Sequence, residues 1–151
     1  SDWSSDVCSS DLVNMIRIIY GKKGSGKTKK IIDAANEAVK SSTGELVFID
    51  DDNRYMYDLR HEIRFVNATE YDVSSPDTFM GFICGILAGN YDMKQLFIDG
   101  FLRLVKSEMA DLEPFFVKLE DITHRHGVDV VISASAKDDT VPEFLKKYIV
   151  D

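Results

Sequence analysis

The sequence predicts a three-layer α/β protein, in which a mostly parallel sheet of five strands carries helices on both faces. The first observation is that short apolar runs of strand length alternate with longer segments whose apolar residues recur at helical spacing. The second is that Gly, Ser or Asp residues follow these runs, at the end where ligands bind in open α/β sheets. Such an alternation favours parallel strands joined by crossover helices. The length of 151 residues suits one domain.

The N-terminal half of the chain contains three of the five predicted strands. Residues 16–20 form an apolar run, and after the glycine-rich residues 21–28 the apolar residues between 29 and 39 recur at helical spacing. Ser-Ser-Thr-Gly at residues 41–44 ends this helix. The further predicted elements are a second strand over residues 45–50, a short helix or turn over residues 53–61, and a third strand over residues 62–66.

The C-terminal half begins with a helix-start pattern at Ser75, Pro76 and Asp77, which supply a cap, a first-turn proline and a first-turn acid. Glycines then recur every four residues, and we expect this bare helix face to pack closely on the sheet; they are Gly81, Gly85 and Gly89. A fourth strand is predicted over residues 95–99, followed by a helix over residues 112–126 that ends at Gly127. A fifth strand is predicted over residues 128–132 and leads into Ser133 and Ser135. Residues 142–150 are predicted to form a terminal helix or a helix-to-strand segment.

The glycine-rich segment fits the pattern G-x-x-x-x-G-K-[ST] of the phosphate-binding P-loop, between a predicted strand and a predicted helix. Glycines allow backbone N–H groups to point at a phosphate, and the helix N-terminus adds unpaired N–H groups and a positive dipole. We expect Lys27 to reach the β- and γ-phosphates and the Thr28 hydroxyl to bind Mg²⁺. The residues expected to bind the nucleotide are Gly21, Lys23, Gly24, Ser25, Gly26, Lys27 and Thr28. Residues 15–151 are therefore predicted to form a P-loop NTPase domain.

Acidic residues follow two of the predicted strands. Asp99 comes directly after Leu96-Phe97-Ile98, the pattern of a Walker B strand, so we expect its carboxylate to hold Mg²⁺ together with Thr28. The second strand ends in three acids, residues 50–52. A carboxylate near the γ-phosphate can orient or deprotonate the attacking water. Asp52 is our candidate for this role, and Asp50 is the alternative. The competing interpretation is that the three acids form a solvated turn with no part in catalysis.

Phe48-Ile49-Asp50-Asp51-Asp52 resembles the Phe-Ile-Asp-Ala-Glu segment of RecA-type ATPases, in which the final Glu activates water. The resemblance implies that role for Asp52, although Asp has a shorter reach than Glu. The order of elements over residues 16–135 also resembles the RecA-like core, which implies a polar residue near the γ-phosphate at Ser133 or Ser135. Ser135 is our candidate, so the implied catalytic residues are Lys27, Asp52 and Ser135.

Three functions remain open from the sequence. The resemblance favours an ATPase that binds ATP (or GTP) with Mg²⁺ and acts through a protein partner or as a homo-oligomer. The alternatives are a small-molecule kinase, for which we find no Arg-rich lid, and a nucleotide-binding module with little hydrolysis. Arg103 and Lys106 follow Asp99, and they are either surface charges or arginine-finger analogues in a neighbour's site.

The composition argues against several kinds of partner. A net charge of −8 argues against non-specific binding to nucleic acid or to an anionic membrane, although a local basic patch would still permit contact with nucleic acid. No apolar run approaches the roughly 18 residues of a membrane span. Two cysteines do not make a disulfide framework, so we expect a reducing, cytoplasmic setting and a buried thiol at Cys84.

Residues 1–14 lack helical and strand periodicity, and they lack the basic start and apolar middle of a signal peptide. They resemble the translation of sequencing-adapter DNA. We expect this tail to be non-native, with the native start at Met15; the alternative is a genuine disordered tail.

Overall fold

The structure is a computed structural model that describes residues 15–150. The expectation of a non-native or disordered tail over residues 1–14 lies outside the described residues. The strands are β1 (Ile16–Lys22), β2 (Glu45–Asp50), β3 (Ile63–Asn67), β4 (Met93–Ile98) and β5 (Asp129–Ala136). The α-helices in the described part of the chain are α2 (Lys27–Val39), α3 (Pro76–Gly89), α4 (Phe101–Val105) and α5 (Glu113–His126).

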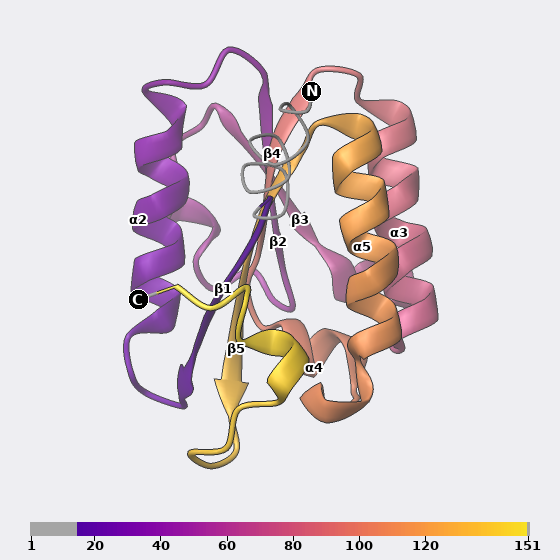
Figure 1. Cartoon of the computed structure of the whole chain (residues 1–151). Coiled ribbons are helices and arrows are strands. Elements are labelled where there is room, and N and C mark those ends of the chain that lie inside the picture. The colour runs from indigo at the N-terminus through magenta and orange to yellow at the C-terminus, as the bar shows by residue number, and fades with distance from the viewer. Residues whose placement is uncertain (1–14, 151) are drawn as a thin grey trace, which may run out of the picture.

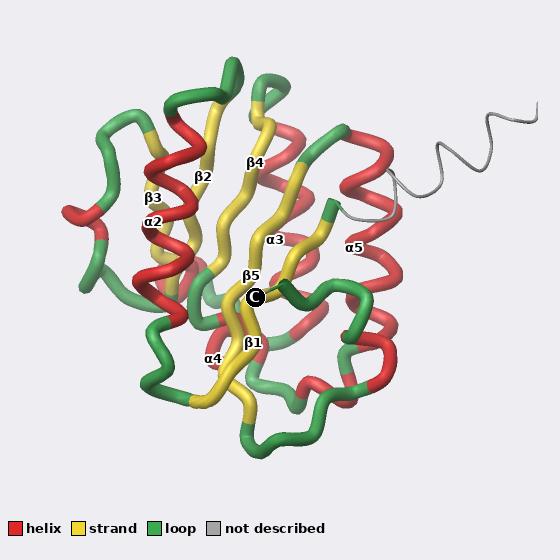
Figure 2. The backbone as a smooth tube through the Cα atoms, turned by 60° about the vertical axis from the view of Figure 1, so that its left-hand side comes forward, coloured by secondary structure: helices red, strands yellow, loops and turns green. Residues whose placement is uncertain are grey.

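All five strands are parallel, in the order β1-β5-β4-β2-β3. Helix α2 covers one face of the sheet, and α3 and α5 cover the other (Figure 1). Figure 2 shows the same layers from a second direction, with α2 in front of the strands and α3 and α5 behind them. The predicted α/β class and five-stranded parallel sheet are therefore confirmed.

The register of the sheet aligns four isoleucines side by side. Ile18 pairs with Ile132, which pairs with Ile98, which in turn pairs with Ile49. All four are fully buried and belong to the core between the sheet and helices α3, α4 and α5. Because side chains alternate along a strand, the residue after each isoleucine faces α2 instead.

Helix α3 begins and helix α5 ends at the capping residues that the sequence predicts. The Ser75 hydroxyl accepts a hydrogen bond from the Thr78 amide, and the Thr78 hydroxyl accepts one from the Ser75 amide, which makes a capping box at the start of α3. Helix α5 ends at Gly127, whose φ is +64°. The short helix α4 is not predicted, because five residues are too few to display helical periodicity. Its first residue, Phe101, packs against the aromatic rings of Phe79, Phe115 and Phe116.

Two expectations for α3 are wrong. A Cβ added at Gly81, Gly85 or Gly89 would meet nothing within 4 Å, so the glycine face is open to solvent instead of packed on the sheet. Cys84 is exposed, not a buried thiol. The reason is that Phe79, Ile83 and Leu87, at intervals of four residues, take the buried side of the helix, which leaves the glycines and Cys84 outside.

The C-terminal segment lies along the outer edge of β1. The Ile18 amide donates to the Tyr148 carbonyl at 2.8 Å, and the Val150 amide donates to the Ile18 carbonyl at 3.0 Å. Ile149 thereby forms a parallel bridge with Ile18, after a short 3₁₀ turn at Glu143–Leu145. This agrees with the predicted helix-to-strand segment. Among residues 15–150, no helix is long and apolar enough to cross a membrane.

Candidate functional site

The carboxyl ends of the central strands open into a cavity of about 620 Å³, which we call the loop cavity. It lies where the strand ends meet the start of α2 and the start of α4. Its lining residues include Lys23, Gly24, Gly26, Lys27, Thr28, Asp50, Asp51, Asp52, Asp99, Arg103, Ser133 and Ser135.

Strand register brings three polar residues together in this cavity. Ser133, Asp99 and Asp50 each follow one of the aligned isoleucines, on β5, β4 and β2 respectively. All three are buried, with 1 to 3% of their surface exposed. Because they face α2, they lie on the same side of the sheet as the glycine-rich loop that leads into that helix.

The glycine-rich loop takes backbone conformations that favour glycine. Gly24 has a φ of +85° and Gly26 a φ of +87°. Gly21 lies close to the Ser25 side chain, and a Cβ there would lie 3.0 Å from the Ser25 hydroxyl. The Ser25 amide closes the loop by donating to the Lys22 carbonyl at 3.1 Å. These residues make a tight turn whose glycines carry no side chain into the cavity.

The N-terminus of α2 has no side-chain cap. Gly26 occupies the cap position, and the first turn contains no acid. Lys27, Lys29 and Lys30 fall in that turn instead, close to the positive end of the helix dipole. The unpaired first-turn amides and these lysines favour a bound anion.

Lys27 is the buried cation of the loop cavity. It is 9% exposed, and its Nζ donates to the Lys22 carbonyl at 2.8 Å. Burial lowers the pKa of this ammonium and the nearby Asp99 carboxylate opposes the effect, while the charge of Arg103 adds to the lowering. The amine is therefore held over the loop that carries the glycines.

Asp99 joins the loop to the neighbouring strands. The Thr28 hydroxyl donates to Asp99 Oδ2 at 3.2 Å, although the two residues are 71 positions apart in the sequence. The Ser133 hydroxyl donates to the other carboxylate oxygen, Oδ1. Hydroxyl and carboxylate oxygens are the ligands that Mg²⁺ prefers, so Thr28 and Asp99 together can hold this ion.

The three consecutive acids after β2 have three different environments. Asp50 is buried, and its Oδ2 has no hydrogen-bond partner among the described residues. Asp51 forms two hydrogen bonds with the Arg103 guanidinium. Asp52 accepts from the Arg54 amide at 2.8 Å, and its other oxygen lies 3.4 Å from Arg54 Nη2. Of the three, Asp50 therefore has the unsatisfied acceptor.

The protonation of Asp50 reflects its burial. Desolvation and the nearby charges of Asp99 and Asp51 raise the pKa of this carboxyl to about 8, against the lowering effect of the hydrogen bond that it accepts from the Asp51 amide. The pKa of Asp51 is lower than usual, because the Arg103 guanidinium outweighs the effect of its own partial burial. Near neutral pH, Asp50 can hold or release a proton, whereas Asp51 is charged.

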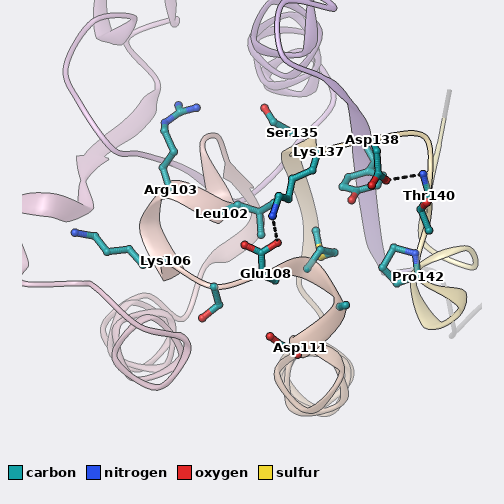
Figure 3. Close-up of a pocket in the computed structure, with 14 residues that line it drawn as sticks. Leu102, Arg103, Lys106, Glu108, Asp111, Ser135, Lys137, Asp138, Thr140 and Pro142 are labelled. Atoms are coloured by element: carbon teal, nitrogen blue, oxygen red, sulfur yellow. Dashed lines mark hydrogen bonds and ion pairs between the residues drawn. The ribbon is translucent and has the colours of Figure 1, made fainter.

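A second cavity of about 880 Å³ adjoins the loop cavity, and we call it the α4 cavity. It lies between α4, the segment after α4 and the loop after β5 (Figure 3). An ion pair between Lys137 and Glu108, at 3.0 Å, crosses it, and Asp138 accepts from the Thr140 amide at 2.8 Å. The two cavities have three lining residues in common, which are Leu102, Arg103 and Ser135.

Most of the predicted site residues meet in the loop cavity. Lys23, Gly24, Gly26, Lys27, Thr28, Asp52, Asp99 and Ser135 line it, and Gly21 and Ser25 support the loop behind it. Of the two serines, Ser133 is the one whose hydroxyl donates directly to Asp99. The roles of these residues in binding and catalysis stay predictions.

The sequence did not predict the pair of Asp51 and Arg103 in this cavity. Asp51 was not distinguished from its acidic neighbours, and Arg103 was expected to be either a surface charge or part of a neighbour's site. The structure has Arg103 in its own chain's loop cavity, bonded to Asp51. No local pattern in the sequence identifies this pair, because its two residues are 52 positions apart.

No protein-family model matches this chain, and no curated protein matches it. The functional conclusion therefore depends on the residues of the two cavities and on their geometry.

Proposed function

We propose that this chain binds a nucleoside triphosphate together with Mg²⁺ and hydrolyses it. ATP is the favoured nucleotide by the RecA resemblance, with GTP as the other possibility. The hydrogen bond between Thr28 and Asp99 carries the proposal. The two residues come from separate sequence motifs that predict the same metal ion, and they meet at 3.2 Å.

The start of α2 supports phosphate binding. Glycines with positive φ leave room for a close approach of phosphate oxygens to the backbone. The uncapped helix N-terminus adds N–H groups and a favourable dipole. The buried Lys27 ammonium supplies the positive charge that β- and γ-phosphates require.

The metal ligands fit Mg²⁺ by their chemistry. Thr28 offers a hydroxyl and Asp99 a carboxylate, both hard oxygen ligands. Ser133 holds the second oxygen of Asp99 and so fixes the orientation of the carboxylate. When bound, Mg²⁺ neutralises the charge that develops on the phosphates.

Two carboxylates are candidates for positioning the attacking water. Asp52 is the one implied by the RecA resemblance, and it lines the loop cavity while bonded to Arg54. Asp50 has a free oxygen in the same cavity, and with a pKa of about 8 it can accept a proton near neutral pH. Ser135 lines the cavity beside them and can donate a hydrogen bond to the water or to the γ-phosphate.

We infer that the hydrolysed nucleotide acts as a switch on a protein partner or a second copy of the chain. A small-molecule kinase is the second candidate, because the α4 cavity adjoins the loop cavity and offers space for an acceptor. A nucleotide-binding module with little hydrolysis is the third, because the Asp52 carboxylate is already engaged by Arg54.

Isothermal titration calorimetry with Mg·ATP and Mg·GTP tests the binding step. Lys27→Ala should weaken binding by about 10- to 100-fold, since a hydrogen-bonded charge is lost. Lys40→Ala is the matched control, because Lys40 is an exposed lysine at the other end of α2, where it pairs with Glu37. Equal affinity of wild type and Lys27→Ala would overturn the proposal.

Phosphate release separates the three functions. A hydrolase releases inorganic phosphate from ATP without an added acceptor. If Asp50 positions the water, Asp50→Asn should reduce this release, and if Asp52 does so, Asp52→Asn should reduce it. ADP formation that depends on an added small molecule would favour the kinase. Tight ATP binding without either product would favour the binding module.

A further inference from the structure

Arg103 is placed between the two cavities of the molecule. It lies on α4, four residues after Asp99, and its side chain lines both the loop cavity and the α4 cavity. Figure 3 shows Arg103 at one side of the α4 cavity, with Ser135 beside the boundary. The same cation therefore faces both the phosphate loop and the adjoining space.

The guanidinium is held in a defined orientation by Asp51. Arg103 Nε donates to Asp51 Oδ2 at 2.6 Å, and Nη2 donates to Oδ1 at 3.1 Å. This is the two-pronged geometry that fixes an arginine most firmly. The side chain of Asp51 is 16% exposed whereas that of Arg103 is 57% exposed, so the acid anchors a cation that reaches into open space.

Gly100 makes this arrangement possible. Its φ is +69°, and a Cβ at this position would lie 2.6 Å from Arg103 Nη2 and 2.9 Å from Asp51 Oδ1. The ion pair therefore packs directly against the backbone between Asp99 and α4.

One end of the guanidinium remains available. The two bonds to Asp51 use Nε and Nη2, and Nη1 forms no hydrogen bond with any described residue. Arginine has five N–H donors, so the two on Nη1 can bind an oxygen in the loop cavity without breaking the pair with Asp51. Its charge already acts at Lys27, whose pKa it helps to lower.

We infer that Arg103, oriented by Asp51, binds the terminal phosphate and so makes the site prefer a triphosphate to a diphosphate. The inference rests on the proposed function, and it places the arginine in its own chain's site. Lys27 and the α2 amides approach a phosphate chain from the loop side. Arg103 lines the same cavity from α4, so we expect its free Nη1 to meet the far end of a phosphate chain that starts at the loop.

The test compares two nucleotides by calorimetry in the presence of Mg²⁺: ADP and the non-hydrolysable β,γ-imido analogue of ATP. Arg103→Ala should weaken binding of the triphosphate analogue by about 10- to 100-fold and change ADP affinity by less than about threefold. Arg125→Ala is the matched control, because Arg125 pairs with Asp121 on the surface of α5. It should change neither affinity.

Two further variants test the role of Asp51 and guard against misfolding of Arg103→Ala. Arg103→Lys keeps the positive charge but cannot form the two parallel hydrogen bonds of a guanidinium, so this variant should lose part of the preference for triphosphate. Asp51→Asn removes a negative charge near the phosphates but loosens the guanidinium, and we expect the preference for triphosphate to fall. A rise in both affinities would instead show that Asp51 acts only by its charge and would overturn its positioning role.

The outcomes distinguish this inference from the proposed function. A wild type that binds neither nucleotide would overturn both. A wild type that binds both, with Arg103→Ala weakening the two equally or not at all, would overturn only the inference about Arg103.

Discussion

The N-termini of α2 and α3 differ in whether side chains of the protein cap their first amide groups. Every helix begins with amide groups that lack helical acceptors. Helix α3 satisfies them with its own side chains, through the Ser75–Thr78 capping box, Pro76 and the acid Asp77. Helix α2 has Gly26 at the cap position, no side-chain cap and no acid in its first turn.

This difference indicates which helix start is built for stability and which is built for a ligand. The α3 cap is completed by its own side chains, and no residue of α3 lines the loop cavity. The α2 start opens into the loop cavity, opposite Asp99 and Asp50, and its first turn carries lysines where an acid would be more stable. We expect a bound anion to satisfy the first amides of α2, as side chains do at α3.

The largest effect is expected from Asp99→Asn, which removes the carboxylate that we propose as the Mg²⁺ ligand opposite the start of α2. The amide is a poorer Mg²⁺ ligand than the carboxylate, so the gain in ATP affinity on adding Mg²⁺ should fall by at least about tenfold. Calorimetry with and without Mg²⁺ measures this, and Asp121→Asn on the surface of α5 is the control. An unchanged Mg²⁺ dependence would show that Asp99 does not hold the metal.

The second largest effect is expected from Asp50, the buried carboxyl that faces α2, on the pH dependence of the free energy of unfolding. Burial raises the pKa of Asp50 from 3.8 to about 8, so the folded state binds this proton more tightly than the unfolded state. The Asp50 contribution to the free energy of unfolding is therefore complete below the ordinary pKa and is lost as pH rises through the folded value. Urea unfolding of wild type and Asp50→Asn across that window should show a steeper decline for wild type; parallel curves would contradict it.

Ser75→Ala tests the self-completed helix start. Loss of this cap should lower the free energy of unfolding by about 1 kcal/mol. ATP affinity should not change, because α3 does not line the loop cavity. Urea unfolding and calorimetry measure the two quantities, with the adjacent Ser74→Ala as the control. A loss of affinity would break the distinction between the two helices.

The smallest effect is expected from Lys30→Glu, which gives α2 the first-turn acid that it lacks. Interaction with the helix dipole should stabilise the free protein by about 0.3–1 kcal/mol, while ATP binds more weakly. Lys40→Glu makes the same charge change at the other end of α2 and should instead lower stability. Thermal melts with and without ATP test this, and stabilisation by both variants would exclude the dipole as the cause.

Local patterns predicted most elements of the fold. The strand at residues 45–50 and the start of α3 at Ser75 follow from apolar runs and capping residues, which act within a few positions of the chain. Helix α4 and the exposure of Cys84 were not predictable in this way. A five-residue helix has no period to detect, and the buried side of α3 depends on which residues meet the aromatic core.

The candidate site was predicted in part. The residues of the glycine-rich loop and Asp99 belong to motifs with fixed spacing, so their types suggested their chemistry. Asp50, Asp51 and Asp52 could not be told apart, because their environments come from Arg103, Arg54 and the depth of the strand end. None of these partners is recognisable from the acids themselves.

By itself, the sequence determined the alternation of strands and helices, the glycine-rich loop before α2 and the acid at the end of β4. These features depend on periodicity, on capping residues and on motif spacing, all of which act over short distances along the chain. Only the tertiary structure decided that β5 lies between β1 and β4, that Ser133, Asp99 and Asp50 stand side by side, and that Arg103 reaches Asp51. These depend on the register between strands far apart in sequence, which packing of the whole sheet selects.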